Sequence, residues 1–385
     1  MKNGFKVMDS DMHIIEPPDL WQRYIDRQFK DQAPRGSTER VADLDLIGPD
    51  GTRWGRNPNN VRNWGENRRQ GHNFQKNQER FKAYEDMGWT GAAQLQGMDA
   101  EGIDVAVIYP SRGLFALTVP DLEPRLAAAI ARAYNDWLSD FCAPDRRRLI
   151  GAGMISPFDV NDAVAEAKRC VNELGFKGVF LRPNIVNGRN WHDPYYEPLW
   201  STLEELGTPI GFHEGDTSAL PHVGEQFGTN VMLSHTFSHP VEQMLAAASF
   251  CGGGILARHP NLKAAFLEGN CSWLPFFLWR LDEHWERLGD VYAPELQMPP
   301  SAYWKNQCFA SVEADEEPVK YTIDYLGSST GLVFSTDFPH GDSKFPESID
   351  RFLQLDISAE AKRQILWDNC AAYYGIAETA RAAGR

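Results

Sequence analysis

The sequence predicts a (β/α)8 barrel with one long insertion after its first strand. Eight short apolar segments alternate with longer segments of helical periodicity, which is typical of a closed parallel barrel. Ionisable residues follow several of these segments, at the end of the barrel where active sites form. The first segment is not followed by a G-x-G-x-x-G motif, which disfavours the alternative of a doubly wound open sheet.

The predicted strands are short runs rich in apolar, β-branched or aromatic residues, as expected for strands buried on both faces. They cover residues 7–13, 104–110, 149–155, 178–183, 209–215, 263–269, 306–312 and 331–337. Amphipathic helices are expected at residues 122–142, 161–174, 196–206, 240–257, 316–326 and 346–353. The start at residue 240 rests on Pro240, because proline is favoured in the first turn of a helix.

Residues 25–100 do not follow this alternation and are rich in Arg, Asn, Gly and Gln. We expect an insertion on the active-site side of the barrel, where it could be a lid, an oligomer contact or a solvated excursion. Residues 1–375 are expected to form a single domain, and residues 376–385 a fraying tail.

The composition excludes several classes of protein. The 38 basic and 53 acidic residues give a formal charge of −15, which disfavours binding to nucleic acid or to an anionic membrane. The six cysteines are scattered, so we expect buried free thiols rather than a disulfide framework or zinc ribbon. The N-terminus lacks the apolar core of a signal peptide, and no apolar run is long enough to span a membrane, so we expect a cytoplasmic protein. We also expect it to act on a small molecule, as a homo- or hetero-oligomer.

Ionisable side chains stand at the ends of most predicted strands. Asp11 and His13 are two positions apart on the first strand, so their side chains share one face. Because buried charge without compensation is costly, a bound cation is favoured over a network of ion pairs. The other residues at strand ends are Arg182, His213, Glu214, Glu268, Glu313 and Asp337.

Two further histidines, His235 and His239, lie near the helix expected at 240–257. At a spacing of four they would share a helical face, but Pro240 suggests a helix that begins near His239, which could then be a capping residue. If His239 faces the barrel mouth, six candidate ligands are enough for two ions. These ligands are Asp11, His13, His213, His239, Glu268 and Asp337.

Four motifs resemble the amidohydrolase-related family, the branch that contains the aminocarboxymuconate-semialdehyde and resorcylate decarboxylases. They are DSDMHIIEPPDLW, GFHEG, HPNLKAAFLEGNCSWLPFFLWRLDEHWE and FSTDFPHGDSKFPES, and the resemblance covers nearly the whole chain. It implies a metal ion held by Asp11, His13, His213 and Asp337.

Two positions depart from the decarboxylase pattern. Asp11 stands where those enzymes have His or Glu, and Glu268-Gly269-Asn270 replaces a His-Gly-Gly motif whose His works in catalysis. These departures weaken the case for simple decarboxylation. An oxygen-rich ligand set suits iron or manganese at least as well as zinc, and some relatives use a dinuclear iron site to activate oxygen. The alternative for Glu268 is a salt bridge to Arg280.

The favoured hypothesis is metal-assisted hydrolysis, or non-oxidative C–C cleavage, of a small organic acid. Asp337 would position or deprotonate a metal-bound water, and Arg182 would receive a substrate carboxylate. His235 is a further catalytic candidate, and the alternative for Arg182 is an ion pair with Glu214. Two other hypotheses stay open: an oxygen-dependent enzyme with a dinuclear iron or iron–manganese centre, and a catalytically silent subunit of a paired enzyme.

Overall fold

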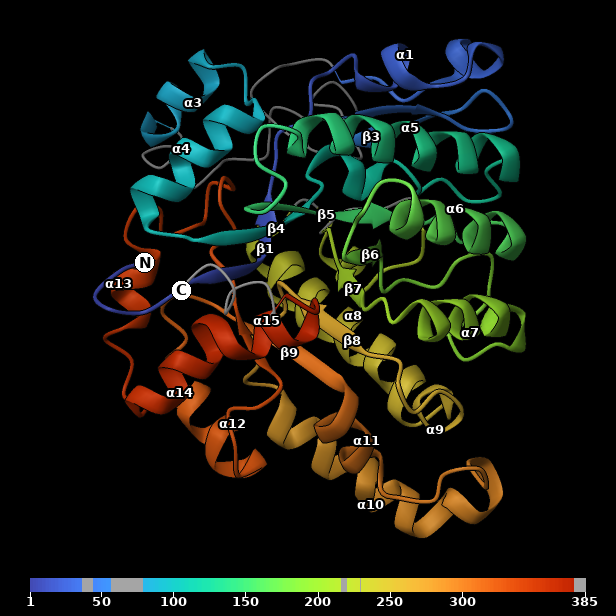
Figure 1. Cartoon of the computed structure of the whole chain (residues 1–385). Helices are drawn as coiled ribbons and strands as arrows, with labels where there is room; N and C mark the ends of the chain where they lie inside the picture. The colour runs from blue at the N-terminus through green and yellow to red at the C-terminus, as the bar shows by residue number, and fades with distance from the viewer. Residues whose placement is uncertain (37–43, 57–78, 216–219, 229, 377–385) are drawn as a thin grey trace.

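Eight parallel strands form a nearly closed barrel with helices around its outside (Figure 1). This computed structural model describes residues 1–36, 44–56, 79–215, 220–228 and 230–376. All eight predicted strands are present, and the predicted fold class is confirmed. In order around the barrel they are β1 (Met8–His13), β4 (Val105–Tyr109), β5 (Leu149–Met154), β6 (Gly178–Leu181), β7 (Ile210–His213), β8 (Ala264–Leu267), β9 (Cys308–Val312) and β10 (Leu332–Phe334).

Every residue of these strands is buried, because helices cover the outside and side chains fill the inside. The barrel closes between β10 and β1. There Ser10 Oγ donates to Phe334 O at 2.8 Å, and His13 N donates to Phe338 O at 2.7 Å. These two bonds fix β1 beside the end of β10 and beside the segment that follows it.

The helices near the predicted ranges have clear start and stop signals. The Glu123 carboxylate accepts from Arg125 N and Leu126 N at the start of α5, and α7 ends at Gly207, whose φ is 62°. The helices that follow β4 are α5 (Pro124–Cys142), α6 (Val160–Asn172), α7 (Glu197–Leu206), α8 (Val231–Cys251), α9 (Ile255–Arg258), α10 (Leu274–Tyr292), α11 (Pro300–Gln307), α12 (Val319–Leu326), α13 (Ser348–Phe352), α14 (Ala359–Arg363) and α15 (Asn369–Tyr373).

The predicted start of a helix at residue 240 is wrong. α8 begins at Val231, and Pro240 lies in its interior. The Asn230 side chain caps the helix by accepting from Leu233 N at 3.3 Å. The earlier start places His235 and His239 one turn apart on the same helix, so the capping role considered for His239 does not apply.

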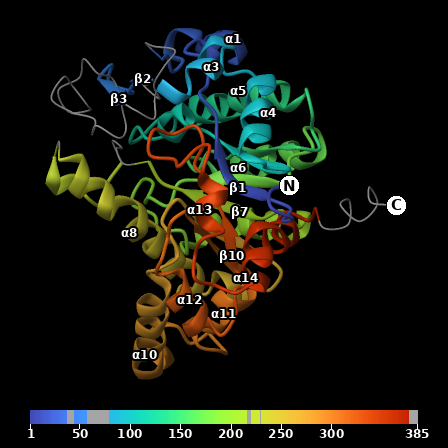
Figure 2. The ribbon, with the colours of Figure 1, turned by 90° about the vertical axis from the view of Figure 1, so that its left-hand side faces the viewer.

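The segment 25–100 contains regular elements. They are η1 (Arg27–Gln32), an antiparallel hairpin of β2 (Leu44–Ile47) and β3 (Arg53–Arg56), and the helices α3 (Lys82–Asp86) and α4 (Gly91–Glu101), preceded by α1 (Leu20–Tyr24). α4 runs directly into β4 and therefore belongs to the strand–helix alternation. Figure 2 shows the hairpin and the start of α8 on the side of the barrel away from the N-terminus. Residues 57–78, the polar centre of this segment, lie outside the described part.

The chain end closes the other end of the barrel. Tyr373 OH donates to Ile210 O at 2.6 Å, and Tyr374 OH lies 2.9 Å from Tyr109 OH. Gly211 makes room for this arrangement, since a Cβ there would lie 1.9 Å from the Tyr109 hydroxyl. Tyr109 in turn stacks on His213, with ring centroids 5.9 Å apart. The floor of the barrel therefore supports a residue at its mouth.

All six cysteines are free and buried, as their spacing predicts. Among the described residues, no helix has the length and apolar character needed to cross a bilayer. Residues 377–385 lie outside the described part, and the domain boundary at 375 stays a prediction.

Gly211→Ala should lower the free energy of unfolding by about 1–3 kcal/mol, because the new methyl group overlaps Tyr109. Urea denaturation measures this cost. The same substitution in a Tyr109→Phe background should cost less, since the nearest atom is gone. Equal costs in the two backgrounds would contradict the close approach.

Candidate metal centre

Two histidines face each other at the barrel mouth. His13 ends β1 and His213 ends β7; both are wholly buried, with their Nε2 atoms 2.9 Å apart. Each Nδ1 bonds a backbone carbonyl, Pro110 O at 2.8 Å from His13 and Glu214 O at 2.7 Å from His213. A carbonyl only accepts, so each Nδ1 carries the proton and, in a neutral ring, each Nε2 has a lone pair. Two such lone pairs repel each other unless a proton or a metal ion lies between them.

Asp11 brings a carboxylate to the same point. Its Oδ1 lies 3.4 Å from His213 Nε2 and 3.6 Å from His13 Nε2. Neither carboxylate oxygen accepts a hydrogen bond from any described residue, although both are buried. The register between β1 and β4 shifts between Asp9 and Met12, so the irregularity spans Ser10 and Asp11. A buried carboxylate without donors is costly, so its position fits a metal ligand.

Glu268 and Asp337 follow β8 and β10 in left-handed backbone conformations, with φ of 50° and 55°. Such strain in residues other than glycine concentrates at functional sites. Glu268 Oε2 lies 2.7 Å from His213 Nε2, and Asp337 Oδ1 lies 3.6 Å from His13 Nε2. Neither oxygen accepts an aligned hydrogen bond from the described residues. Short contacts without hydrogen-bond alignment are expected of ligands that share a cation.

The electrostatics of the cluster favour added positive charge. Burial raises the pKa of Asp11 to about 7, and burial together with Glu268 raises the pKa of Asp337 well above its usual range. Burial, reinforced by His340, lowers the pKa of His13 well below its usual value. For His213, burial is outweighed by the neighbouring carboxylates and the pKa rises. Carboxylates held this close repel one another, and a divalent cation relieves that repulsion.

α8 brings a second pair of histidines to the mouth. His239 is buried, and its Nε2 lies 3.4 Å from Glu268 Oε1. Its ring stacks on that of His235 with centroids 4.2 Å apart. Ligand atoms of His235, His239 and Glu268 lie within 4.8 Å of one another. The two oxygens of Glu268 therefore face different groups, Oε2 toward His213 and Oε1 toward His239.

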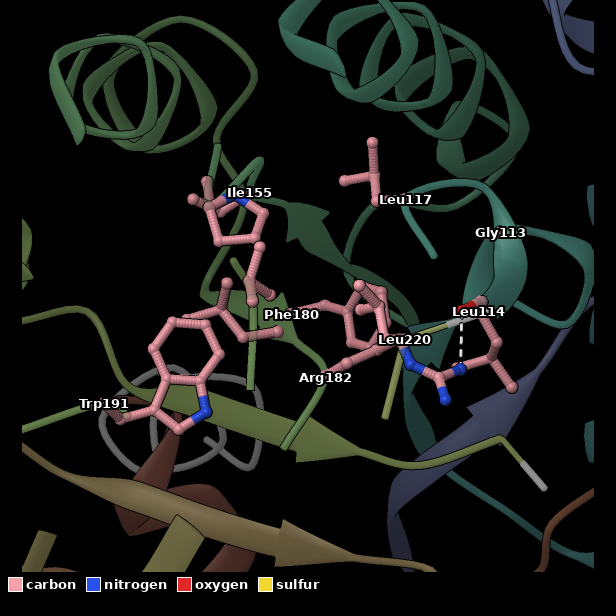
Figure 3. A pocket seen from close by; sticks show the side chains of 11 residues that line it. Gly113, Leu114, Leu117, Ile155, Phe180, Arg182, Trp191 and Leu220 are labelled. Carbon is pink, nitrogen blue, oxygen red and sulfur yellow. Dashed lines mark hydrogen bonds between the residues drawn. The ribbon is translucent and has the colours of Figure 1, made fainter. Parts of the chain in front are cut away.

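Arg182 forms the ion pair with Glu214 that the sequence offered as its alternative role. Its Nη2 donates to Glu214 Oε1 at 2.8 Å and to Gly215 O at 2.9 Å, its Nη1 to Leu114 O at 2.7 Å, and its Nε to Asn184 Oδ1 at 2.8 Å. Arg182 also borders a small, mostly apolar pocket (Figure 3). The other residues that line it include Leu114, Ile155, Phe180, Trp191 and Leu220.

The salt bridge between Glu268 and Arg280, the alternative left open by the sequence, is wrong. The guanidinium of Arg280 contacts Glu283 instead, at 3.6 Å. Glu313 is half-buried after β9, and burial together with Glu316 and Glu268 raises its pKa to about 8. Among the described residues, three groups of His, Asp and Glu side chains have ligand atoms within 4.8 Å of one another, and we call them the metal groups. Glu313 belongs to none of them.

His340 and Asp9 also contact the cluster, although neither was among the site residues predicted from the sequence. His340 Nδ1 lies 2.7 Å from Asp337 Oδ1, and its ring stacks on His13 with centroids 4.1 Å apart. The Asp9 carboxylate accepts from Asp11 N at 3.0 Å and from the Thr336 hydroxyl, which ties β1 to the end of β10. Two sequence features point to these residues. His340 lies three residues after Asp337, and Asp9 alternates with Asp11 in DSDMH.

Comparison with known proteins identifies the family. The amidohydrolase family model matches residues 9–376, and the chain belongs to that family. One curated relative, 2-amino-3-carboxymuconate-6-semialdehyde decarboxylase of Dictyostelium discoideum, is 26% identical over 301 residues, which cover 77% of this chain and 79% of the relative. Gamma-resorcylate decarboxylase of a Rhizobium species is 27% identical over 256 residues, with 64% and 76% covered.

Solved structures share the fold. An amidohydrolase from Mycobacterium avium subsp. paratuberculosis has a TM-score of 0.77 at 22% identity, covering 97% of this chain and 98% of its own. A 5-carboxyvanillate decarboxylase from Novosphingobium aromaticivorans has a TM-score of 0.69 at 19% identity, with 97% and 98% covered. The latter structure contains bound manganese.

Asp11→Ala and His13→Ala should each weaken Mn²⁺ binding by about 100-fold or more, beyond the effect of outer residues that only orient ligands. Chelator competition measures the affinity, and circular dichroism checks the fold. Glu313→Gln is the matched control, because it removes a nearby carboxylate that is outside the metal groups. Near-normal affinity in either alanine variant would contradict the assignment of that residue.

Proposed function

We propose that this chain is a metal-dependent decarboxylase that removes a carboxylate from a small organic acid without oxidation. The observation that carries the proposal is the pair of inward-facing Nε2 atoms of His13 and His213, beside the Asp11 carboxylate, which accepts no hydrogen bond from the described residues. The decarboxylases among the relatives support the class of reaction. A divalent manganese, iron or zinc ion bound there would polarise a substrate oxygen and offset the charge of its carboxylate.

Decarboxylation breaks the bond between the carboxylate carbon and the rest of the substrate. CO2 leaves, the electron pair stays on the remaining carbon, and a proton must be delivered to that carbon. Asp337 follows β10, whereas Asp11 lies on the neighbouring strand β1, and both reach the mouth of the barrel. Asp337 is the candidate residue to position this proton. The Glu268-Gly269-Asn270 segment has no imidazole for the task, so the proton donor differs from that of the decarboxylases with a His-Gly-Gly motif.

The pocket beside Arg182 favours an apolar substrate body. It lies at the ends of β5 and β6, and β6 is next to β7, which carries His213. Its lining side chains are apolar apart from Arg182, so it suits an apolar part of the substrate. Arg182 donates to Asn184, to Glu214 and to two backbone oxygens, so it would contribute one remaining N–H rather than a bidentate fork.

A second ion is the favoured extension of this centre. Because Glu268 directs one oxygen to His213 and the other to His239, it is placed to bridge two cations. The second cation would be held by His235, His239 and Glu268. This arrangement favours His235 as a ligand over the catalytic role expected from the sequence.

Oxygen-dependent chemistry at two iron or iron–manganese ions is the second candidate function, since Glu268, with one oxygen toward His213 and the other toward His239, would be able to hold both ions. A catalytically silent barrel is disfavoured, because it would not need so many buried carboxylates without donors. A cytoplasmic location and an oligomeric assembly stay predictions.

The manganese-loaded protein should release CO2 from at least one hydroxylated aromatic or muconate-type acid, at the same rate with and without oxygen. A CO2-coupled assay over a panel of such acids measures this, with His213→Ala as the inactive control. Turnover that requires oxygen would replace the proposal with the oxygenase. A protein that binds metal but converts no acid in either atmosphere would contradict both.

Glu268→Gln should lower the number of ions bound per chain, because a neutral amide is a poor bridge between two cations. Elemental analysis after dialysis against Mn²⁺ or Fe²⁺ measures the number. Glu242→Gln is the matched control: Glu242 lies on the same helix as His239 but accepts from Val223 N. Equal metal content in wild type and Glu268→Gln would contradict the bridging role.

A further inference from the structure

His340 completes a pattern shared by the histidines of the centre. His13 and His213 each place Nδ1 on a backbone oxygen and Nε2 inward, and His239 places Nδ1 3.0 Å from Ser238 Oγ and Nε2 toward Glu268. His340 is arranged in the same way with its nitrogens exchanged. Its Nε2 lies 2.8 Å from Ser111 Oγ, and its Nδ1 faces Asp337.

The contact between His340 and Asp337 is not an aligned hydrogen bond. Nδ1 and Oδ1 are 2.7 Å apart, yet Asp337 Oδ1 accepts no hydrogen bond from the described residues. The same combination occurs between His213 and Glu268 at the proposed metal site. Ligand atoms of His340, Asp337, His13 and Glu268 lie within 4.8 Å of one another. Two ligands on neighbouring positions of one ion produce such a short, misaligned contact.

Ser111 supplies the outer support that a histidine ligand needs. A neutral ring that ligates through Nδ1 carries its proton on Nε2, which then donates to the Ser111 hydroxyl. Ser111 is itself fixed, because the Glu16 carboxylate accepts from the backbone N–H groups of Ser111, Arg112 and Gly113 at 3.1, 2.8 and 2.9 Å. Glu16 is wholly buried and follows His13 by three residues. The loop after β4 is thus tied to the strand that carries two ligands.

We propose that His340 is a further ligand of the metal centre, bound through Nδ1, and that Ser111 and Glu16 hold it in the required orientation. This ligand would supply an imidazole from the turn after β10. Glu268, after β8, stands where the decarboxylase pattern has the His of the His-Gly-Gly motif. The proposal rests on the metal centre proposed above. It does not depend on the reaction, because binding of the metal is measured without substrate.

The test counts imidazole ligands in the Mn²⁺-loaded protein by electron spin echo envelope modulation, and measures Mn²⁺ affinity by chelator competition. His340→Ala should lose one coordinated imidazole and bind Mn²⁺ more weakly than Ser111→Ala. Ser111→Ala should keep every imidazole and weaken binding by about 10- to 100-fold, as expected for an outer residue. Adding free imidazole to His340→Gly should restore the missing nitrogen signal.

His192→Ala is the matched control, since His192 Nδ1 also contacts a serine hydroxyl, Ser249 Oγ at 3.1 Å, but belongs to none of the metal groups. It should change neither the imidazole count nor the affinity. An unchanged imidazole count in folded His340→Ala, with no effect of added imidazole on His340→Gly, would overturn the proposal. If no variant and not even the wild type binds Mn²⁺, the metal centre itself fails, which is a separate outcome.

Discussion

The mouth of this barrel is organised around the repulsion between two imidazole nitrogens. His13 and His213 are each fixed through Nδ1 to a backbone carbonyl, so their Nε2 atoms are forced to within 2.9 Å of each other. Neither ring can turn away without breaking a buried hydrogen bond, which costs about 1–3 kcal/mol for an unsatisfied partner. A cation held by the two nitrogens would remove this repulsion and would also compensate the charge of Asp11.

The fold maintains this arrangement from several directions. The carbonyls of Pro110 and Glu214 come from segments that directly follow β4 and β7, so the tautomer of each ring is set by the barrel itself. Asp9 links the first strand to the segment after the last, and Glu16 holds the loop after β4. Such outer contacts orient ligands and raise their affinity. The strained backbone at Glu268 and Asp337 persists because the surrounding structure fixes it.

Much of the site could be predicted because parallel strands end at the same mouth. Asp11, His13, His213, Glu268 and Asp337 needed only their positions at strand ends to be grouped. The start of α8 was not predicted, because the expected start rested on Pro240 in a first-turn position. The helix is instead capped by Asn230, ten residues earlier, and carries Pro240 in its interior. His340 was missed because its contacts with Ser111, which is 229 positions away, and with the ring of His13 exist only in the folded chain.

A crystal structure of the protein soaked in Mn²⁺, with anomalous scattering at the metal edge, would show whether His13 and His213 hold a cation between them. We expect an anomalous peak within about 2.0–2.4 Å of His13 Nε2 and of His213 Nε2, with an Asp11 oxygen in the same coordination shell. The absence of a peak at saturating Mn²⁺, with the two Nε2 atoms still in direct contact, would contradict it. The two rings would then share a proton instead of a metal ion.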